Sequence, residues 1–151
     1  MGTRIGVGLL GLGTVGCGVA GILQTPEGRH PLVAELELVR VAIRDLQRPR
    51  PIALPESVLT NDPQAVVDDP AVQVVVEVMG GIEPARTLIM RAIAAGKAVV
   101  TANKAVIARH GEEIAAAAAA AGVYVLIEAA VGGGIPIIEP LKQSLGGNQI
   151  E

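Results

Sequence analysis

Hydrophobic residues along this chain gather in six short runs, and segments of helical or loop character separate them. The clearest run spans residues 72–78 and is β-branched at nearly every position, which is typical of a strand that is buried on both faces of a parallel sheet. The run at 36–43 is less regular, because Glu37 and Arg40 interrupt it. We predict strands over residues 5–10, 36–43, 58–60, 72–78, 97–101 and 123–129.

The segments between these runs predict helices, and helix-breaking residues mark their ends. Asp62 followed by Pro63 is a typical helix start, and Gly96 and Gly122 are typical of helix ends. The helices are expected over residues 15–23, 63–69 and 84–95, and from 103 to 121 with an interruption at Gly111. Strands that alternate with helices predict an α/β fold, namely a Rossmann-type, doubly wound, parallel six-stranded sheet with helices on both faces and strand order 3-2-1-4-5-6.

The first predicted strand ends in a glycine-rich turn of the form Gly-x-Gly-x-x-Gly, made by Gly11, Gly13 and Gly16. Gly11 permits a tight turn, Gly13 lets the backbone approach a pyrophosphate, and Gly16 allows the helix to pack closely on the strand. The N–H groups at the start of the helix also favour a phosphate. The motif alone is weak evidence in a chain with 19 glycines, and the alternative is a turn without a ligand. Its position between a strand and a helix favours dinucleotide binding.

Composition narrows the classes of function. The net charge of −3 gives no electrostatic footprint for nucleic acid, and Tyr124 is the only aromatic residue, so bases would find no stacking platform. No apolar run is long and uncharged enough to span a membrane, and the N-terminus does not resemble a signal peptide. We therefore expect a cytoplasmic protein with neither a nucleic-acid nor a membrane partner. Cys17 is the only cysteine and is expected to be a buried, inert thiol.

The residues after the second predicted strand bear on the choice of cofactor. In this fold the adenosine ribose lies here, where an acidic residue binds the 2′-hydroxyl of NAD and an arginine accommodates the 2′-phosphate of NADP. Arg44 comes first and Asp45 second, while Arg48 and Arg50 add positive charge in the following loop. We expect NADP to be preferred, with NAD as the alternative that Asp45 keeps open.

Later strand ends also carry polar or glycine-rich segments. Ligands of doubly wound sheets bind outside the carboxyl ends of the strands, so we expect these segments to meet at one crevice. The cofactor-binding residues predicted there, beyond the first turn, are Met79, Gly80, Gly81 and Thr101. Glu77 is either a polar group on the substrate side or a buried carboxylate with hydrogen-bond partners.

Taken together, these segments resemble homoserine dehydrogenase. The resemblance covers all 151 residues in the family's order and spacing, and its later stretches are more specific than the glycine turn. The matching stretches are GLGTVG (11–16), VAIRD (41–45), EVMGG (77–81), GKAVVTANKAVIA (96–108) and EAAVGGGIPII (128–138). The resemblance implies NAD(P)-linked interconversion of L-homoserine and L-aspartate 4-semialdehyde, in the biosynthesis of threonine, methionine and isoleucine.

The resemblance also implies roles for individual residues. Arg44 would read the adenosine ribose, and Lys104 matches the family's lysine beside the nicotinamide and the substrate. As the catalytic candidate, the Lys104 ammonium could stabilise alkoxide charge that develops during hydride transfer. The residues that would line the cofactor pyrophosphate are Leu12, Gly13, Thr14 and Val15.

A cation site is implied in the same way. In the family, the turn after Glu128 holds a monovalent cation, usually sodium. Its ligands would be the Glu128 carboxylate and the backbone carbonyls of Val131, Gly133 and Ile135. The alternative is a carboxylate that accepts hydrogen bonds from the backbone N–H groups of the turn.

The family's substrate and dimerisation domain is not among these 151 residues. We therefore expect residues 1–134 to be an NAD(P)-binding domain and residues 135–151 to be the start of the linker or helix into that second domain. The fragment is expected to be inactive alone, and the full-length enzyme to be a homo-oligomer that binds a small-molecule substrate. The open alternative is a stand-alone NAD(P)-binding module that regulates or senses redox state, although a sensor would not need Lys104 beside the nicotinamide.

Overall fold

The computed structural model describes residues 4–143, and it contains one six-stranded parallel sheet with the order β3-β2-β1-β4-β5-β6. The strands are β1 (Ile5–Leu10), β2 (Leu36–Ala42), β3 (Leu59–Thr60), β4 (Val74–Glu77), β5 (Ala98–Thr101) and β6 (Val125–Leu126). The strand order and the parallel pairing confirm the predicted fold class. Asp62 also caps its helix as predicted, because its side chain accepts a hydrogen bond from the Gln64 backbone N–H at 2.9 Å.

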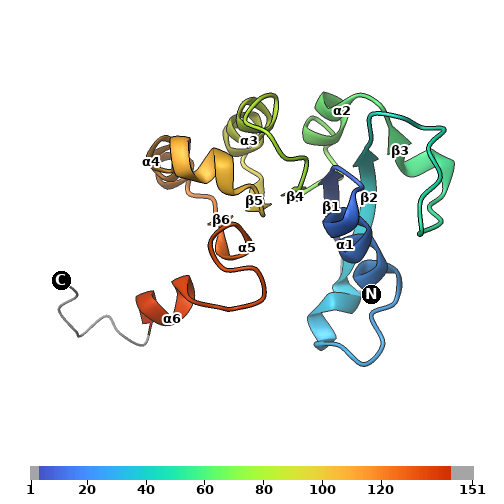
Figure 1. Cartoon of the computed structure of the whole chain (residues 1–151), viewed down its shortest axis with the longest axis horizontal. Coiled ribbons are helices and arrows are strands. Elements are labelled where there is room, and N and C mark those ends of the chain that lie inside the picture. The colour runs from blue at the N-terminus through green and yellow to red at the C-terminus, as the bar shows by residue number, and fades with distance from the viewer. Residues whose placement is uncertain (1–3, 144–151) are drawn as a thin grey trace.

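Helices cover both faces of this sheet (Figure 1). They are α1 (Thr14–Gln24), α2 (Pro63–Val67), α3 (Ala85–Ala94), α4 (Lys104–Ala121), α5 (Glu128–Val131) and α6 (Ile138–Gln143), with short 3-10 helices η1 (Pro31–Glu35) and η2 (Glu56–Val58). In Figure 1, α2, α3 and α4 lie above the sheet and α1 lies below it.

The hydrophobic core is divided by the sheet because successive strand residues point to opposite faces. Leu10 packs with residues of α2, α3 and α4, whereas its neighbour Leu9 packs in a second cluster with Ala20 of α1. In β5, Val99 likewise belongs to the cluster of Leu10, whereas Val100 packs against the cluster of Leu9. Strands that are buried on both faces explain why the predicted runs are almost continuously apolar.

Two predicted elements differ from the structure. Helix α4 runs without interruption through Gly111, because one glycine costs only about 1 kcal/mol and the alanines at 115–121 of the same helix have the highest helix propensity. The sixth strand was predicted to reach residue 129 but ends at Leu126, and Glu128 begins the short helix α5. β6 is an edge strand that pairs only with β5, so the sheet holds fewer of its residues.

The glycine turn brings β1 and α1 into very close contact. Gly11 has a φ of 103°, a conformation that favours glycine, and a Cβ atom at Gly16 would lie 2.2 Å from the Gly11 carbonyl oxygen. Gly16 is therefore required for packing, whereas a Cβ atom at Gly18, in the same helix, would meet nothing within 4 Å.

These two helical glycines give a matched pair of substitutions. Gly16→Ala should lower the free energy of unfolding by about 1–3 kcal/mol, because the methyl group overpacks the turn. Gly18→Ala should raise it by up to about 1 kcal/mol, since alanine is the better helix former. Urea unfolding followed by circular dichroism measures both, and a shift in the same direction for the two variants would contradict this account of the turn.

Candidate functional site

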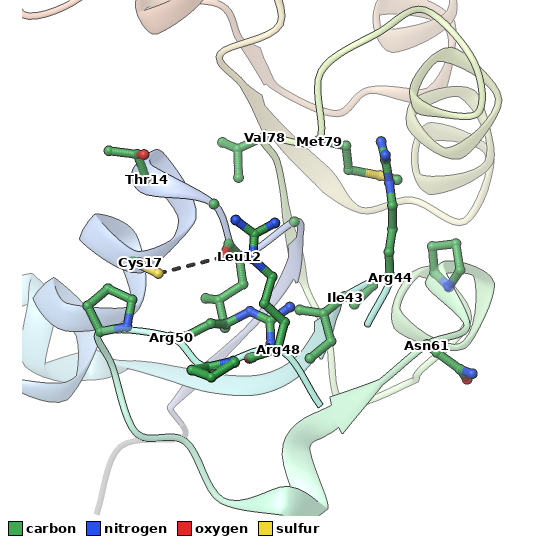
Figure 2. Close-up of a pocket in the computed structure, with 16 residues that line it drawn as sticks. Leu12, Thr14, Cys17, Ile43, Arg44, Arg48, Arg50, Asn61, Val78 and Met79 are labelled. Atoms are coloured by element: carbon green, nitrogen blue, oxygen red, sulfur yellow. Dashed lines mark hydrogen bonds between the residues drawn. The ribbon is translucent and has the colours of Figure 1, made fainter. Parts of the chain in front are cut away.

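A cleft of about 620 Å³ opens at the carboxyl ends of β1 and β2 (Figure 2). We call it the first cleft. Its walls come from the glycine turn, the end of β2, the loop that follows β2, the start of α2 and the segment after β4. The lining residues are Gly11, Leu12, Gly13, Thr14, Cys17, Ala42, Ile43, Arg44, Arg48, Pro49, Arg50, Pro51, Asn61, Pro63, Val78 and Met79.

The glycine turn leaves backbone exposed at the start of α1. Gly13 is the N-cap residue of α1, and no side chain of the helix start makes a capping hydrogen bond there. A Cβ atom at Gly13 would meet nothing within 4 Å, so the space beside this residue is open to the cleft. Thr14 and Val15 are exposed at the first turn. This helix start can therefore offer N–H groups and the positive end of its dipole to an anion.

Positive charge is concentrated on the other walls of the first cleft. Arg44, Arg48 and Arg50 all line it, and Figure 2 shows Arg44 on the side of Met79 and Asn61. Within residues 4–143, none of these arginines forms an ion pair with a carboxylate. In this part of the chain, the guanidinium groups of the cleft are therefore not paired with a carboxylate.

The loop that carries these arginines is held by its own polar groups. Arg50 donates hydrogen bonds to the backbone oxygens of Asp45 and Arg48 at 2.9 and 2.8 Å. The Asp45 carboxylate accepts a hydrogen bond from the Gln47 N–H at 2.9 Å. Arg50 therefore stabilises the loop, a role that residue type and spacing did not indicate.

A second cleft of about 260 Å³ lies next to the first, and Val78 lines both. Its other lining residues are Val15, Gly80, Gly81, Ala102, Asn103, Lys104 and Ala105. Lys104 is the first residue of α4 and is exposed, while Asn103 caps that helix by accepting a hydrogen bond from the Val106 N–H at 3.2 Å. We call this the second cleft.

The structure brings most of the predicted cofactor-binding residues together at these two clefts. Two of them lie elsewhere. Gly16 is buried against Gly11, so its part is in packing. Thr101 lines neither cleft: its side chain is fully buried, donates to Glu77 Oε2 at 2.7 Å and accepts from the Asn103 N–H at 3.0 Å. The Thr101 hydroxyl therefore faces the protein interior.

Glu77 is a buried carboxylate with hydrogen-bond partners, the second of the two alternatives for this residue. Besides Thr101, it accepts hydrogen bonds from the Met79 N–H at 2.8 Å and from Asn103 Nδ2 at 3.4 Å. Asn103 was not singled out from the sequence, although an asparagine before a helical run is a common N-cap signal.

Glu128 lies in the first turn of α5, and its carboxylate organises the following loop. Its Oε1 atom accepts hydrogen bonds from the backbone N–H groups of Ile137 and Ile138, the latter at 2.9 Å. The residues 128–138 therefore form a closed loop whose ends this carboxylate joins. In the part of the chain that the structure describes, no group of three or more His, Cys, Asp or Glu residues could hold a metal ion.

Two further expectations can be compared with the structure. Cys17 was expected to be buried but is only half-buried, because it lines the first cleft, where its thiol donates a weak hydrogen bond to the Leu12 carbonyl at 3.6 Å. Among residues 4–143, no helix combines the length and the apolar character that crossing a membrane requires.

Comparison with known proteins agrees with this geometry. The family model for the NAD-binding domain of homoserine dehydrogenase matches residues 11–128. Homoserine dehydrogenase of Synechocystis sp. is 63% identical over 145 residues, which cover 96% of this chain and 34% of that protein. Homoserine dehydrogenase of Corynebacterium glutamicum is 45% identical over 152 residues, covering 99% of this chain and 34% of the relative.

A solved structure shows the same similarity in three dimensions. The homoserine dehydrogenase from Thiobacillus denitrificans superposes with a TM-score of 0.82 at 49% identity, covering 98% of this chain and 35% of that one. The chain spans about a third of the length of the relatives it matches. Its fold, its glycine turn and its match to the family model agree, and the chain belongs to the homoserine dehydrogenase family, of which it carries the NAD-binding domain.

Proposed function

We propose that this chain binds NADP in preference to NAD and serves an enzyme that interconverts L-homoserine and L-aspartate 4-semialdehyde. One observation carries the proposal. Two adjoining clefts share Val78, with an open helix start and three arginines in the first and an exposed lysine in the second. A dinucleotide needs such a pair of sites, one for its phosphates and adenosine and one for its nicotinamide.

The first cleft suits the adenosine and phosphate half of the cofactor. Leu12, Gly13, Thr14 and Val15 surround the start of α1, where backbone N–H groups and the helix dipole favour the pyrophosphate. Met79 lines this cleft on the side of Arg44, and Gly80 and Gly81 line the second cleft. The cofactor would therefore cross from one cleft to the other past Val78.

Charge favours NADP over NAD. The 2′-phosphate of NADP is an anion that a guanidinium group binds well, and Arg44 stands at the end of β2, where the adenosine ribose is expected. The Asp45 carboxylate is the acidic group that would bind the 2′-hydroxyl of NAD. It already accepts a hydrogen bond from the Gln47 N–H. Arg48 adds a second charge to the same cleft.

Lys104 is proposed as the catalytic residue. A cation at the first turn of a helix is disfavoured by the helix dipole, so helix stability does not explain its position. The bound nicotinamide would supply the hydride chemistry. Lys104 would place an ammonium donor at the substrate oxygen, where it stabilises negative charge as a carbonyl is reduced or a hydroxyl is oxidised.

The loop at 128–138 is proposed as a sodium site. Its donors would be the Glu128 carboxylate and the carbonyl oxygens of Val131, Gly133 and Ile135. Hard oxygen donors of this kind suit a small hard cation. The carboxylate already joins the two ends of the loop through the N–H groups of Ile137 and Ile138. The donor chemistry therefore fits the ion.

The remaining enzyme is proposed to pack beside β6, and residues 135–151 to lead into its substrate and dimerisation domain. Large apolar side chains are exposed together on this side of the molecule, and monomeric proteins rarely leave such patches uncovered. They are Tyr124, Leu126, Val131, Ile135, Ile137 and Leu141. We also propose that the full-length enzyme is a homo-oligomer, in which the dimerisation domain would cover this patch.

Cofactor titrations test the proposal directly. The chain should bind NADPH about tenfold more tightly than NADH, since one guanidinium–phosphate contact is worth about 1.4 kcal/mol or more. Arg44→Ala should remove this difference by weakening NADPH binding alone. Nicotinamide fluorescence is the readout, because the chain has no tryptophan and the protein background is low.

The control is Arg29→Ala, which removes an exposed arginine that lines neither cleft. It changes net charge by the same amount and should leave both affinities within about twofold. Equal affinity of the unaltered chain for NADPH and NADH would refute the NADP preference, and no binding of either would refute the nucleotide-binding role itself.

Sodium binding predicts ion-specific stabilisation. Thermal unfolding in sodium chloride should occur at a higher temperature than in choline chloride at equal ionic strength, because an ion that binds only the folded state stabilises it. Glu128→Gln should abolish the difference. Glu139→Gln is the control, since Glu139 pairs with Gln143 in α6 and is outside the proposed donor set. A sodium response that survives Glu128→Gln would show that this loop is not the site.

A further inference from the structure

Glu77 is the most completely buried acidic residue of the site, with none of its surface exposed. It stands at the end of β4 and accepts hydrogen bonds from the Met79 N–H, the Thr101 hydroxyl and the Asn103 amide. Among residues 4–143, no lysine, arginine or histidine forms an ion pair with it. A buried carboxylate is costly unless hydrogen bonds compensate it, so these neutral donors define the geometry that the carboxylate can adopt.

The partners of Glu77 continue the network to the walls of the second cleft. Asn103 also donates to the Gly81 carbonyl at 2.7 Å and caps α4 through the Val106 N–H. Its own N–H is bound by the Thr101 hydroxyl. Glu77, Thr101 and Asn103, which we call the Glu77 cluster, thereby join the turn after β4, the end of β5 and the start of α4.

Backbone pairing by itself does not hold these segments together. The ladder between β4 and β5 ends at the pair Glu77 and Thr101, with one further bond from the Ala102 N–H to the Glu77 carbonyl. Beyond this point the chain turns through Gly80 and Gly81, both with a φ of 77°. The Glu77 cluster provides hydrogen bonds across the gap, through the Met79 N–H on one side of these glycines and the Gly81 carbonyl on the other.

We propose that Glu77 is a positioning residue: through Thr101 and Asn103 it fixes the distance across the second cleft between the Gly80–Gly81 turn and Lys104. This inference rests on the proposed function, in which the second cleft receives the nicotinamide half of the cofactor. Glu77 is fully buried, so it acts through the residues that it holds. Loss of its bonds to Thr101 and Asn103 should therefore affect the second cleft more than the first.

Thr101→Val tests the cluster with the least change in shape. Valine fills the same volume but leaves the Asn103 N–H and Glu77 Oε2 without the hydroxyl. Thr101→Ser keeps the hydroxyl and is the rescue variant. Two probes separate the clefts: NADPH occupies both, whereas adenosine 2′,5′-bisphosphate occupies only the first.

Thr101→Val should weaken NADPH binding by about tenfold while changing bisphosphate binding by less than about twofold, as expected for one disturbed hydrogen-bond pair. Thr101→Ser should restore NADPH binding. Glu77→Gln should be milder than Glu77→Leu, because the amide oxygen can still accept two hydrogen bonds and its NH₂ can donate to Thr101. Equal weakening of both probes by Thr101→Val, or no weakening of either, would overturn the proposal.

A control variant and a measurement without ligand distinguish a loss of stability from a loss of ligand binding. Val99→Ala, in the core of β5, lowers stability without touching the cluster and should leave the NADPH-to-bisphosphate affinity ratio unchanged. Amide hydrogen exchange at Gly80, Gly81 and Lys104 should rise in Thr101→Val more than in Val99→Ala. If the unaltered chain binds neither probe, the proposed function fails. If amide exchange at Gly80, Gly81 and Lys104 is unchanged in Thr101→Val, the positioning role of Glu77 is overturned, whether or not the chain binds the probes.

Discussion

The alignment of strand ends in the parallel sheet is the constraint on which the whole site depends. Leu10 of β1 pairs with Glu77 of β4, and Glu77 pairs with Thr101 of β5, so three strands stop at one level. Each segment that leaves the sheet therefore starts from the same edge. The glycine turn, the Met79–Gly81 segment and the start of α4 become neighbours although they are far apart in the sequence.

The two clefts at this edge are built by different physical means. The first offers an open helix start and guanidinium groups that form no ion pair with a carboxylate of residues 4–143, and Arg50 holds the loop that carries them. The second has one exposed cation, Lys104, and its walls are joined by hydrogen bonds of the Glu77 cluster. Long-range charge suits the phosphates of a dinucleotide, whereas short directional bonds suit a site where a ring and a substrate must be held at a fixed distance.

The far side of the sheet has a different character. Beyond β6 the chain makes two short helices and a loop that the Glu128 carboxylate closes, and apolar side chains stay exposed. This chain corresponds to about a third of its relatives. Exposed apolar side chains beside β6 agree with the proposal that further protein packs against this domain.

The sequence by itself determined the sheet order, the glycine turn, the position of Arg44 and Lys104 at strand ends, and the family, because these depend on local patterns of apolar, glycine and charged residues. It could not decide whether Gly111 interrupts α4, since the stability of neighbouring turns outweighs a single glycine. The conversion of the expected strand end into α5 likewise depended on the edge position of β6. Only the tertiary structure decided the roles of Glu77 and Thr101, because the hydrogen bond that defines them joins residues 24 positions apart in the sequence, and no local pattern records such a partner.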